Sequence, residues 1–209
     1  MKKMVIIGIC GKMGNQMYEY YKDTYEIIGV DIKKHEIVPT LDSIDEIKNI
    51  DVIVDFSSTE CYEQLKKAIL SRIPVLSGTT GYDLSQIEAL ENLAKEKETP
   101  FVWKANYARG IKLFSKLIDV SKGKLEYLDF VEIHATTKKD APSGTAKVLA
   151  RQLEIKEDKI QSLRINQAPA IHEIIFSSDD ERVILRHEIM NKKAFIIGFD
   201  EELKNVVRS

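Results

Sequence analysis

The chain has 209 residues, of which 44% are hydrophobic, so it is long enough to bury one large core or two smaller ones. Its 31 basic and 33 acidic residues leave a formal net charge of −2, which gives no electrostatic reason to expect a nucleic acid or an anionic membrane as a partner. Two cysteines are too few for a disulfide framework and agree with a reducing, cytoplasmic setting. The apolar run near the N-terminus ends after about six residues, which is too short for a signal core or a membrane span.

The first hundred residues alternate between short apolar runs and amphipathic segments. Apolar runs typical of a parallel sheet occur at residues 4–7, 25–30, 51–56, 74–76 and 101–103. Helical patterns lie between them at residues 15–21, 62–70 and 84–97. This order predicts an α/β fold with a Rossmann-like doubly wound parallel sheet, which we assign to a dinucleotide-binding domain over residues 1–106.

The pattern changes after Asn106. Helices are predicted at residues 110–121 and 143–153, and strands at 128–134, 160–165, 170–176 and 182–188, with 194–199 as a candidate further strand. Short polar turns between the later strands favour a mixed open sheet. We therefore expect residues 107–199 to form a second, smaller α+β domain.

The first candidate site is a glycine-rich turn that follows a predicted strand and opens a predicted helix. Glycines at this spacing permit a tight turn and let backbone NH groups approach a pyrophosphate, although the spacing is GxxGxxG rather than GxGxxG. An acidic residue at the end of the second strand stands where a carboxylate accepts hydrogen bonds from an adenosine ribose. The context favours a dinucleotide site over a merely structural turn, made by Gly8, Ile9, Cys10, Gly11, Lys12, Met13, Gly14 and Asp31.

The same residues bear on the choice between NADH and NADPH. Asp31 would repel a 2′-phosphate, which favours NADH. Basic residues close in sequence offset that repulsion and keep NADPH open, namely Lys12, Lys33, Lys34 and His35.

A second glycine-containing loop, Gly78-Thr-Thr-Gly81, follows the predicted strand 74–76. It falls at the edge of the sheet where open α/β folds bind ligands. The backbone could approach a flat ring and the threonines could offer hydroxyl groups, but a tight turn that needs two glycines explains the loop equally well.

The most polar stretch is HATTKKDAPSGTAK, residues 134–147. Its second half has the features of a helix start, whose NH groups at Ser143, Gly144 and Thr145 can hold a carboxylate-sized anion. His134 ends the preceding strand and can exchange protons near neutral pH, while Lys138 can supply a fixed charge or a proton. An ordinary helix cap with solvated lysines and a strand-end histidine accounts for the same residues about as well.

Taken together, these motifs resemble the dihydrodipicolinate reductases of lysine and diaminopimelate synthesis. The likeness rests on the Gly8–Gly14 turn, the Gly78–Gly81 loop, the segment Ala105-Asn-Tyr-Ala108 and the signature from Glu132 to Ala146, in the family's order. The resemblance implies hydride transfer from NADH or NADPH to 4-hydroxy-tetrahydrodipicolinate, a dicarboxylate, with loss of water. It also implies a homotetramer built by the second domain, and it allows the tail at residues 200–209 to return to the first domain.

The resemblance assigns roles to individual residues. It implies His134 as the acid/base group and Lys138 as the proton donor, with Gly144 and Thr145 at the substrate carboxylate. The helix-start pattern adds Ser143 to the predicted substrate site. Further cofactor contacts are implied at Gly78, Thr79, Thr80, Ala105, Asn106, Tyr107 and Ala108.

The chain also departs from the family pattern. Ala135 stands in place of a second histidine, Lys12 in place of an arginine, and Ala108 in place of a serine. These changes predict weaker activity, a different nicotinamide preference, or loss of the reaction, and the preserved His134 and Lys138 argue against loss. Two alternatives stay open: another two-domain NAD(P)-dependent oxidoreductase, such as an amino-acid or semialdehyde dehydrogenase, and a non-catalytic dinucleotide sensor.

The remaining aromatic and histidine residues are interpreted as structural. His172 and His187 lie in strand-like runs and are expected to be packed or at an interface, and Trp103 is expected in the core. No His, Cys, Asp or Glu cluster has the sequence spacing of metal ligands, so we expect no metal.

Overall fold

The computed structural model describes residues 1–208, which form two compact units. The first unit contains Met1–Lys104 and the segment from Phe199 onward, and the second contains Ala105–Gly198. In residues 1–208 no helix combines the length and the apolar character that crossing a membrane requires.

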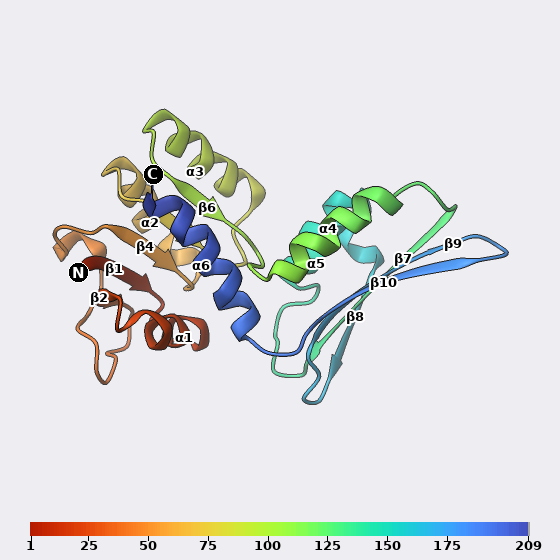
Figure 1. The fold of residues 1–209 in the computed structure, drawn as a ribbon, viewed down its shortest axis with the longest axis horizontal. Helices are drawn as coiled ribbons and strands as arrows, with labels where there is room; N and C mark the ends of the chain where they lie inside the picture. Colours follow the sequence, from red (N-terminus) through yellow and green to blue (C-terminus); the bar gives the residue numbers. More distant parts are fainter. Residues whose placement is uncertain (209) are drawn as a thin grey trace. The chain divides into compact units, whose positions relative to one another are not determined.

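The first unit is built on a six-stranded sheet in the order β3-β2-β1-β4-β5-β6, and every strand pair in it is parallel (Figure 1). This is the doubly wound order of dinucleotide-binding folds, so the predicted fold class is confirmed. The strands are β1 (Lys2–Ile7), β2 (Tyr25–Val30), β3 (Thr40–Leu41), β4 (Val52–Asp55), β5 (Val75–Ser77) and β6 (Phe101–Trp103). The helices are α1 (Lys12–Tyr21), α2 (Tyr62–Leu70), α3 (Leu84–Glu96) and the later part of α6 (Lys193–Arg208), with short 3₁₀ turns at Ile44–Glu46 and Thr59–Cys61.

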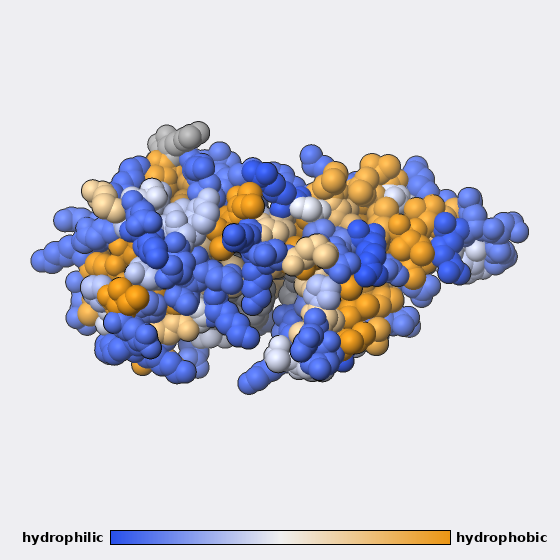
Figure 2. Space-filling model, turned by 60° about the horizontal axis from the view of Figure 1, so that its bottom comes forward, coloured by the Kyte–Doolittle hydropathy of each residue, from blue (hydrophilic) through white to orange (hydrophobic). Residues whose placement is uncertain are grey.

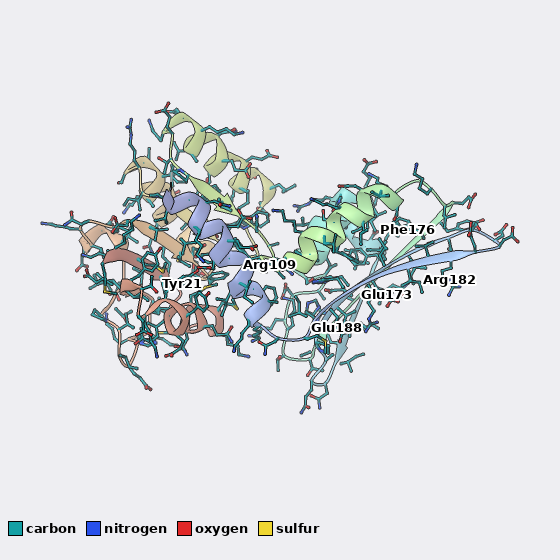
Figure 3. The ribbon with its side chains drawn as sticks, in the orientation of Figure 1. Tyr21, Arg109, Glu173, Phe176, Arg182 and Glu188 are labelled. Atoms are coloured by element: carbon teal, nitrogen blue, oxygen red, sulfur yellow. The ribbon has the colours of Figure 1, made fainter. Side chains whose placement is uncertain are left out.

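Burial on both faces explains why these strands are continuous apolar runs. Val5, Ile7 and Ile53 pack in one buried cluster with residues of α2 and α3, such as Leu65 and Leu90. Side chains on the opposite face are also fully buried, including Met4, Ile6 and Val54. Tyr21 at the end of α1 meets Phe199 of α6, and its hydroxyl lies 3.2 Å from Asp200 Oδ1, so α6 completes this unit (Figure 3).

The second unit contains a four-stranded sheet in the order β10-β9-β7-β8. Its elements are α4 (Arg109–Ser121), β7 (Tyr127–Ala135), α5 (Gly144–Gln152), a 3₁₀ turn at Glu157–Lys159, β8 (Ile160–Ile165), β9 (Ala170–Ser177) and β10 (Arg182–Ile189). β7 and β8 are parallel and the other pairs are antiparallel, which confirms the predicted mixed sheet. Phe114 and Ile118 of α4 and Leu149 of α5 pack on one face of this sheet, against Phe130 and Ile174.

One predicted element is wrong. Residues 194–199 are not a strand but belong to α6. The buried hydrophobic side chains of α6 are Ile196, Phe199, Leu203 and Val206, which recur at the spacing of a helix face. The short run AFIIGF fits either structure, and the apolar positions beyond it decide for the helix.

Candidate active site

The glycine-rich turn joins β1 to α1 and is held by close backbone contacts. Gly8 has a φ of +82°, and a Cβ there would lie 2.5 Å from the carbonyl oxygen of Phe56. A Cβ on Gly14 would lie 2.1 Å from the carbonyl oxygen of Gly8, so the first turn of α1 packs directly on the loop. Gly11 is the N-cap of α1 and its NH donates to Gly8 O at 3.0 Å. The turn therefore leaves the N-terminus of α1 open to an anion, with Lys12 exposed beside it.

Asp31 at the end of β2 is bound to this turn. Its Oδ2 accepts a hydrogen bond from the NH of Cys10 at 3.0 Å, and its Oδ1 accepts one from the NH of Lys33 at 3.1 Å. A pocket of about 330 Å³ opens beside these groups. Its lining includes Gly8, Cys10, Gly11, Asp31, Lys33, Asp42, Ser57, Ser58 and Cys61. Ile9 is fully buried, and the pocket lining does not include Ile9, Lys12, Met13 or Gly14 of the predicted set.

The Gly78–Gly81 loop is joined to the end of β4 by a buried carboxylate. Asp55 accepts hydrogen bonds from the hydroxyl of Ser77 at 2.6 Å and from the NH of Ser57 at 3.1 Å. Burial raises the pKa of Asp55, although the hydroxyl donors act in the opposite direction. Thr79 is buried, and its hydroxyl accepts a hydrogen bond from the NH of Ser57 at 2.9 Å, so its side chain ties the loop to the segment that follows β4.

The other residues of this loop have separate environments. A Cβ on Gly78 would lie 2.1 Å from the ring of Phe56, whereas Thr80 is exposed and free to face a ligand. Trp103 supports the loop from β6, because its indole NH donates to Thr79 O at 2.8 Å.

The segment Ala105–Ala108 belongs to the second unit and leads into α4. Asn106 turns it toward α5: its Oδ1 accepts from the NH of Ala108 at 2.9 Å and its Nδ2 donates to Thr145 Oγ1 at 3.3 Å. Tyr107 and Ala108 are buried. In this segment the structure thus joins a residue assigned to the cofactor with one assigned to the substrate.

His134 lies near the end of β7, two residues after Glu132 and on the same face of the sheet. Its Nδ1 lies 2.9 Å from Oε2 of Glu132, whose side chain is fully buried. Oε1 of the same carboxylate accepts from Arg164 Nη2 at 3.0 Å and from the backbone NH of Ser143 at 3.1 Å. Burial raises the pKa of Glu132, but the donors around it outweigh burial and hold the pKa well below its ordinary value. Glu132 is therefore an anion that contacts His134, Arg164 and the N-cap of α5.

Lys138 lies in the loop between β7 and α5, with its NH bonded to Ala135 O at 2.9 Å. Its ammonium lies 2.8 Å from Oδ1 of Asp140. Burial raises the pKa of Asp140, but the hydrogen bond and the charge of Lys138 outweigh burial and lower it. The ammonium is thus held within the short loop that follows the strand carrying His134.

The N-terminus of α5 completes the site. Ser143 is its N-cap: the hydroxyl accepts from the NH of Ala146 at 3.2 Å, and its own NH is used by Glu132. The Ser143 NH is therefore not free for a substrate, contrary to the role expected for it. Gly144 and Thr145 form the first turn of the helix and are partly exposed. The backbone NH of Gly144 already interacts with the Asp140 carboxylate, so Thr145 is the member of the predicted set best placed to meet a further anion.

His172 on β9 pairs in register with Glu132 and packs edge-on against His134, with ring centroids 5.5 Å apart. Burial lowers the pKa of His172 to about 3, so its ring is neutral at physiological pH. One ligand atom from each of Glu132, His134 and His172 lies within 4.8 Å of the others, so this group could hold a metal ion. The guanidinium of Arg164 on the same carboxylate disfavours a cation there.

Sequence reasoning missed Arg164 and the proximity of His172 to His134. Both come from strands far from the signature in sequence, and only the register of β7 with β8 and β9 brings them to it. The available signal was the alternation of Glu132 and His134 on one strand face, which placed a buried carboxylate beside the histidine.

Comparisons with known proteins agree with this geometry. Residues 2–107 match the family model described as dihydrodipicolinate reductase, N-terminus, and residues 110–207 match the one described as dihydrodipicolinate reductase, C-terminus. The chain belongs to the dihydrodipicolinate reductase family. Members of this family are NAD(P)-dependent reductases of lysine biosynthesis, and the chain is an oxidoreductase of that kind.

Individual relatives are similar over nearly the whole chain. The 4-hydroxy-tetrahydrodipicolinate reductase of Rickettsia bellii is 34% identical over 211 residues, covering 91% of this chain and 83% of the relative. The protein of the same name from Dictyoglomus turgidum is 27% identical and covers 100% of this chain and 94% of its own.

Two solved structures share the fold. The dipicolinate-bound dihydrodipicolinate reductase from Paenisporosarcina sp. TG-14 has a TM-score of 0.77 at 22% identity, covering 100% of this chain and 95% of that one. The aspartate dehydrogenase from Thermotoga maritima has a TM-score of 0.65 at 14% identity, with coverage of 99% and 97%. The two-unit plan therefore occurs in reductases of different substrates.

Proposed function

We propose that this member of the dihydrodipicolinate reductase family reduces 4-hydroxy-tetrahydrodipicolinate with a hydride from NADH or NADPH, yielding tetrahydrodipicolinate. The observation that carries the proposal is that His134, Lys138 and the start of α5 share one site in the second unit. An imidazole, an ammonium and helix-terminal NH groups are the means needed to move protons on an anionic ring and to hold its carboxylate. The relatives named for this reaction support the choice of substrate.

The reaction takes up one hydride and one proton and releases one water. When bound, the dihydronicotinamide supplies the hydride. His134 removes a ring proton and returns it to the departing hydroxyl, so that the hydroxyl leaves as water. Lys138 donates the proton that balances the hydride, and Gly144 and Thr145 hold a substrate carboxylate at the start of α5.

The first unit is our candidate for the cofactor domain. The close approach of Gly14 to Gly8 leaves no room for a side chain, and the N-terminus of α1 faces outward beside the pocket that Asp31 lines. We propose a preference for NADH. Asp31 keeps its carboxylate at the pocket, while the nearby charge of Lys34 is partly offset by Asp42 at 3.4 Å.

The homotetramer is also a proposal, and the surface of the second unit supports it. One face of the β10-β9-β7-β8 sheet packs on helices, and the other exposes aliphatic side chains. These include Leu163, Ile165 and Ile184, each about half exposed. Figure 2 shows hydrophobic residues gathered over this unit. An apolar sheet face of this kind is typical of a subunit interface.

We further propose that the enzyme works in the cytoplasm and without a metal ion. Its two cysteines are free thiols, as expected in a reducing compartment. Arg164 already supplies positive charge to the Glu132 carboxylate.

The proposal is tested by following hydrogen from the cofactor into the product. The enzyme is supplied with nicotinamide dinucleotide carrying deuterium at the transferable position, together with the product of the upstream synthase. We expect tetrahydrodipicolinate that contains a single deuterium by mass spectrometry. Product without deuterium, or no product, would contradict the proposed reaction.

A further inference from the structure

We infer that Glu132 is a positioning residue that holds His134 as the tautomer with its proton on Nδ1, leaving Nε2 for the substrate. The inference rests on the proposed function only in that His134 acts on the substrate. The contacts of Glu132 and His134 within the chain support it independently of the reaction.

The geometry of β7 makes the pairing direct. Glu132 and His134 are two residues apart on one strand, so both side chains leave the same face of the sheet. Nδ1 of His134 lies 2.9 Å from Oε2 of Glu132. Both atoms are buried and make no other hydrogen bond in the part of the chain that the structure describes, although the pair does not have the alignment of a regular hydrogen bond. A carboxylate accepts and does not donate, so the proton between the two atoms belongs to Nδ1.

The carboxylate is itself held from its other side. Arg164 Nη2 and the NH of Ser143 donate to Oε1 at 3.0 and 3.1 Å. Arg164 also donates through Nε to Lys138 O at 3.3 Å and through Nη2 to Asp140 O. Glu132 and Arg164 therefore connect the histidine, the loop that carries Lys138 and the cap of α5.

The ring of His134 is further restricted by His172, which packs edge-on against it and is buried. The His172 contact and the short distance from Nδ1 to a fixed carboxylate both favour the observed orientation of the imidazole. Nε2 is then the atom that exchanges protons, in either charge state of the ring.

The most informative change is Glu132→Gln, which keeps the shape and removes the charge. The carboxylate offers two acceptor oxygens, one toward His134 and one toward Arg164 and Ser143, whereas an amide offers only one. Either the histidine or the opposite donors must then face an NH₂ group. We expect His134 to lose its fixed tautomer in this variant.

The tautomer is measured by ¹⁵N NMR of histidine-labelled protein. The chain has only four histidines, and the His134 signals are those missing from His134→Asn. In the wild type we expect neutral His134 to show a protonated Nδ1 and an unprotonated Nε2. In Glu132→Gln we expect a mixture of tautomers or the reversed one. Protonation on Nε2 in the wild type would overturn the inference even if the variant fails to fold.

Kinetics provide the second readout. We expect Glu132→Gln to lower kcat on the order of 10- to 100-fold, because His134 is then no longer held with Nε2 free for the substrate. NADH affinity should stay within about twofold of the wild type. The matched control is Glu173→Gln on β9, whose carboxylate pairs with Arg186 at 2.9 Å and which is labelled in Figure 3. Equal losses of kcat in the two variants, or an unchanged kcat in Glu132→Gln, would contradict a positioning role.

The NMR result separates this inference from the proposed function. A wild-type enzyme that fails to turn over 4-hydroxy-tetrahydrodipicolinate but shows the expected tautomer change overturns the reaction and leaves the Glu132–His134 relationship standing. Turnover by the wild type, with the same His134 tautomer in the wild type and in Glu132→Gln, supports the reaction and overturns the inference about Glu132.

Discussion

Nζ of Lys138 lies 2.8 Å from Oδ1 of Asp140, within the loop that joins β7 to α5. Both side chains are partly exposed, so the pair contributes little to stability. Its effect is local, because it holds an ammonium near the helix start where we place a substrate carboxylate.

Replacing Lys138 by alanine tests its role as proton donor. We expect kcat to fall by about 10²- to 10⁴-fold, because the proton must then come from water. The Kd for NADH, measured by fluorescence titration, should stay close to that of the wild type. Lys139→Ala removes the adjacent exposed lysine and should leave both values nearly unchanged. A comparable loss of cofactor affinity in Lys138→Ala would contradict the assignment.

The Glu132 carboxylate makes the free energy of unfolding depend on pH. Its pKa in the folded protein lies below the ordinary 4.5, so the unfolded chain takes up the proton first as pH falls. The stabilisation is present above pH 4.5 and is lost as the pH falls from there toward the lowered pKa. The difference in unfolding free energy between the wild type and Glu132→Gln should therefore narrow below pH 4.5 in urea titrations followed by circular dichroism. A difference that is constant with pH would show that the charge of Glu132 is not what stabilises the site.

Gly14→Ala should disrupt the turn that begins α1. The added Cβ would lie 2.1 Å from Gly8 O, which is backbone and cannot move aside easily. We expect a loss of about 1–3 kcal/mol of stability, together with weaker NADH binding. Gly11→Ala is the matched control. A Cβ on Gly11 would lie 3.1 Å from the same Gly8 oxygen, so this substitution should lower the stability less. Equal thermal denaturation midpoints for the two variants would argue against the packing described for Gly14.

Asp31→Asn tests the basis of nicotinamide preference. The amide keeps one acceptor for the backbone NH groups of Cys10 and Lys33 but removes the charge. We expect the ratio of the NADPH to the NADH Kd to fall about tenfold, equivalent to about 1.4 kcal/mol. The matched control is Asp51→Asn, because Asp51 also accepts a hydrogen bond from a backbone NH, that of Lys3. This variant should leave the ratio unchanged. An unaltered ratio in Asp31→Asn would show that residues other than Asp31 set the preference between NADH and NADPH.

The proposed assembly is tested on the exposed sheet face. Ile184→Lys places a charge at a residue that is 50% exposed, and we expect smaller species in sedimentation velocity. Val120→Lys changes an equally apolar residue on α4 that is 71% exposed, and should leave the assembly intact. The same sedimentation coefficient for Ile184→Lys and the wild type would exclude this face as the interface.

Local patterns allowed much of this structure to be predicted from the sequence. The strands of the first unit are continuous apolar runs because both faces of the sheet are buried, and the Gly8–Gly14 turn is recognised by the strand and helix that flank it. The position of Asp31 followed from the same unit, and the structure places its carboxylate on the NH of Cys10.

Other features depend on contacts that no local pattern records. The apolar run at residues 194–199 is compatible with a strand or a helix, and its packing as α6 is decided by residues further along the chain. The neighbours of Glu132 are set by strand register, which pairs Glu132 with His172 and places Arg164 opposite His134. The contact of the Ser143 NH with the buried Glu132 carboxylate likewise joins two elements that no local pattern connects.

The central claim is tested most directly by oxidation of NADH in the presence of the upstream synthase and its substrates. We predict a fall in NADH absorbance that depends on the synthase product, a slower fall with NADPH, and a fall that is about 10²- to 10⁴-fold slower with Lys138→Ala. Absence of oxidation by the wild type, with dinucleotide binding intact, would contradict the account and favour a dinucleotide sensor in which Ala135 marks a lost activity.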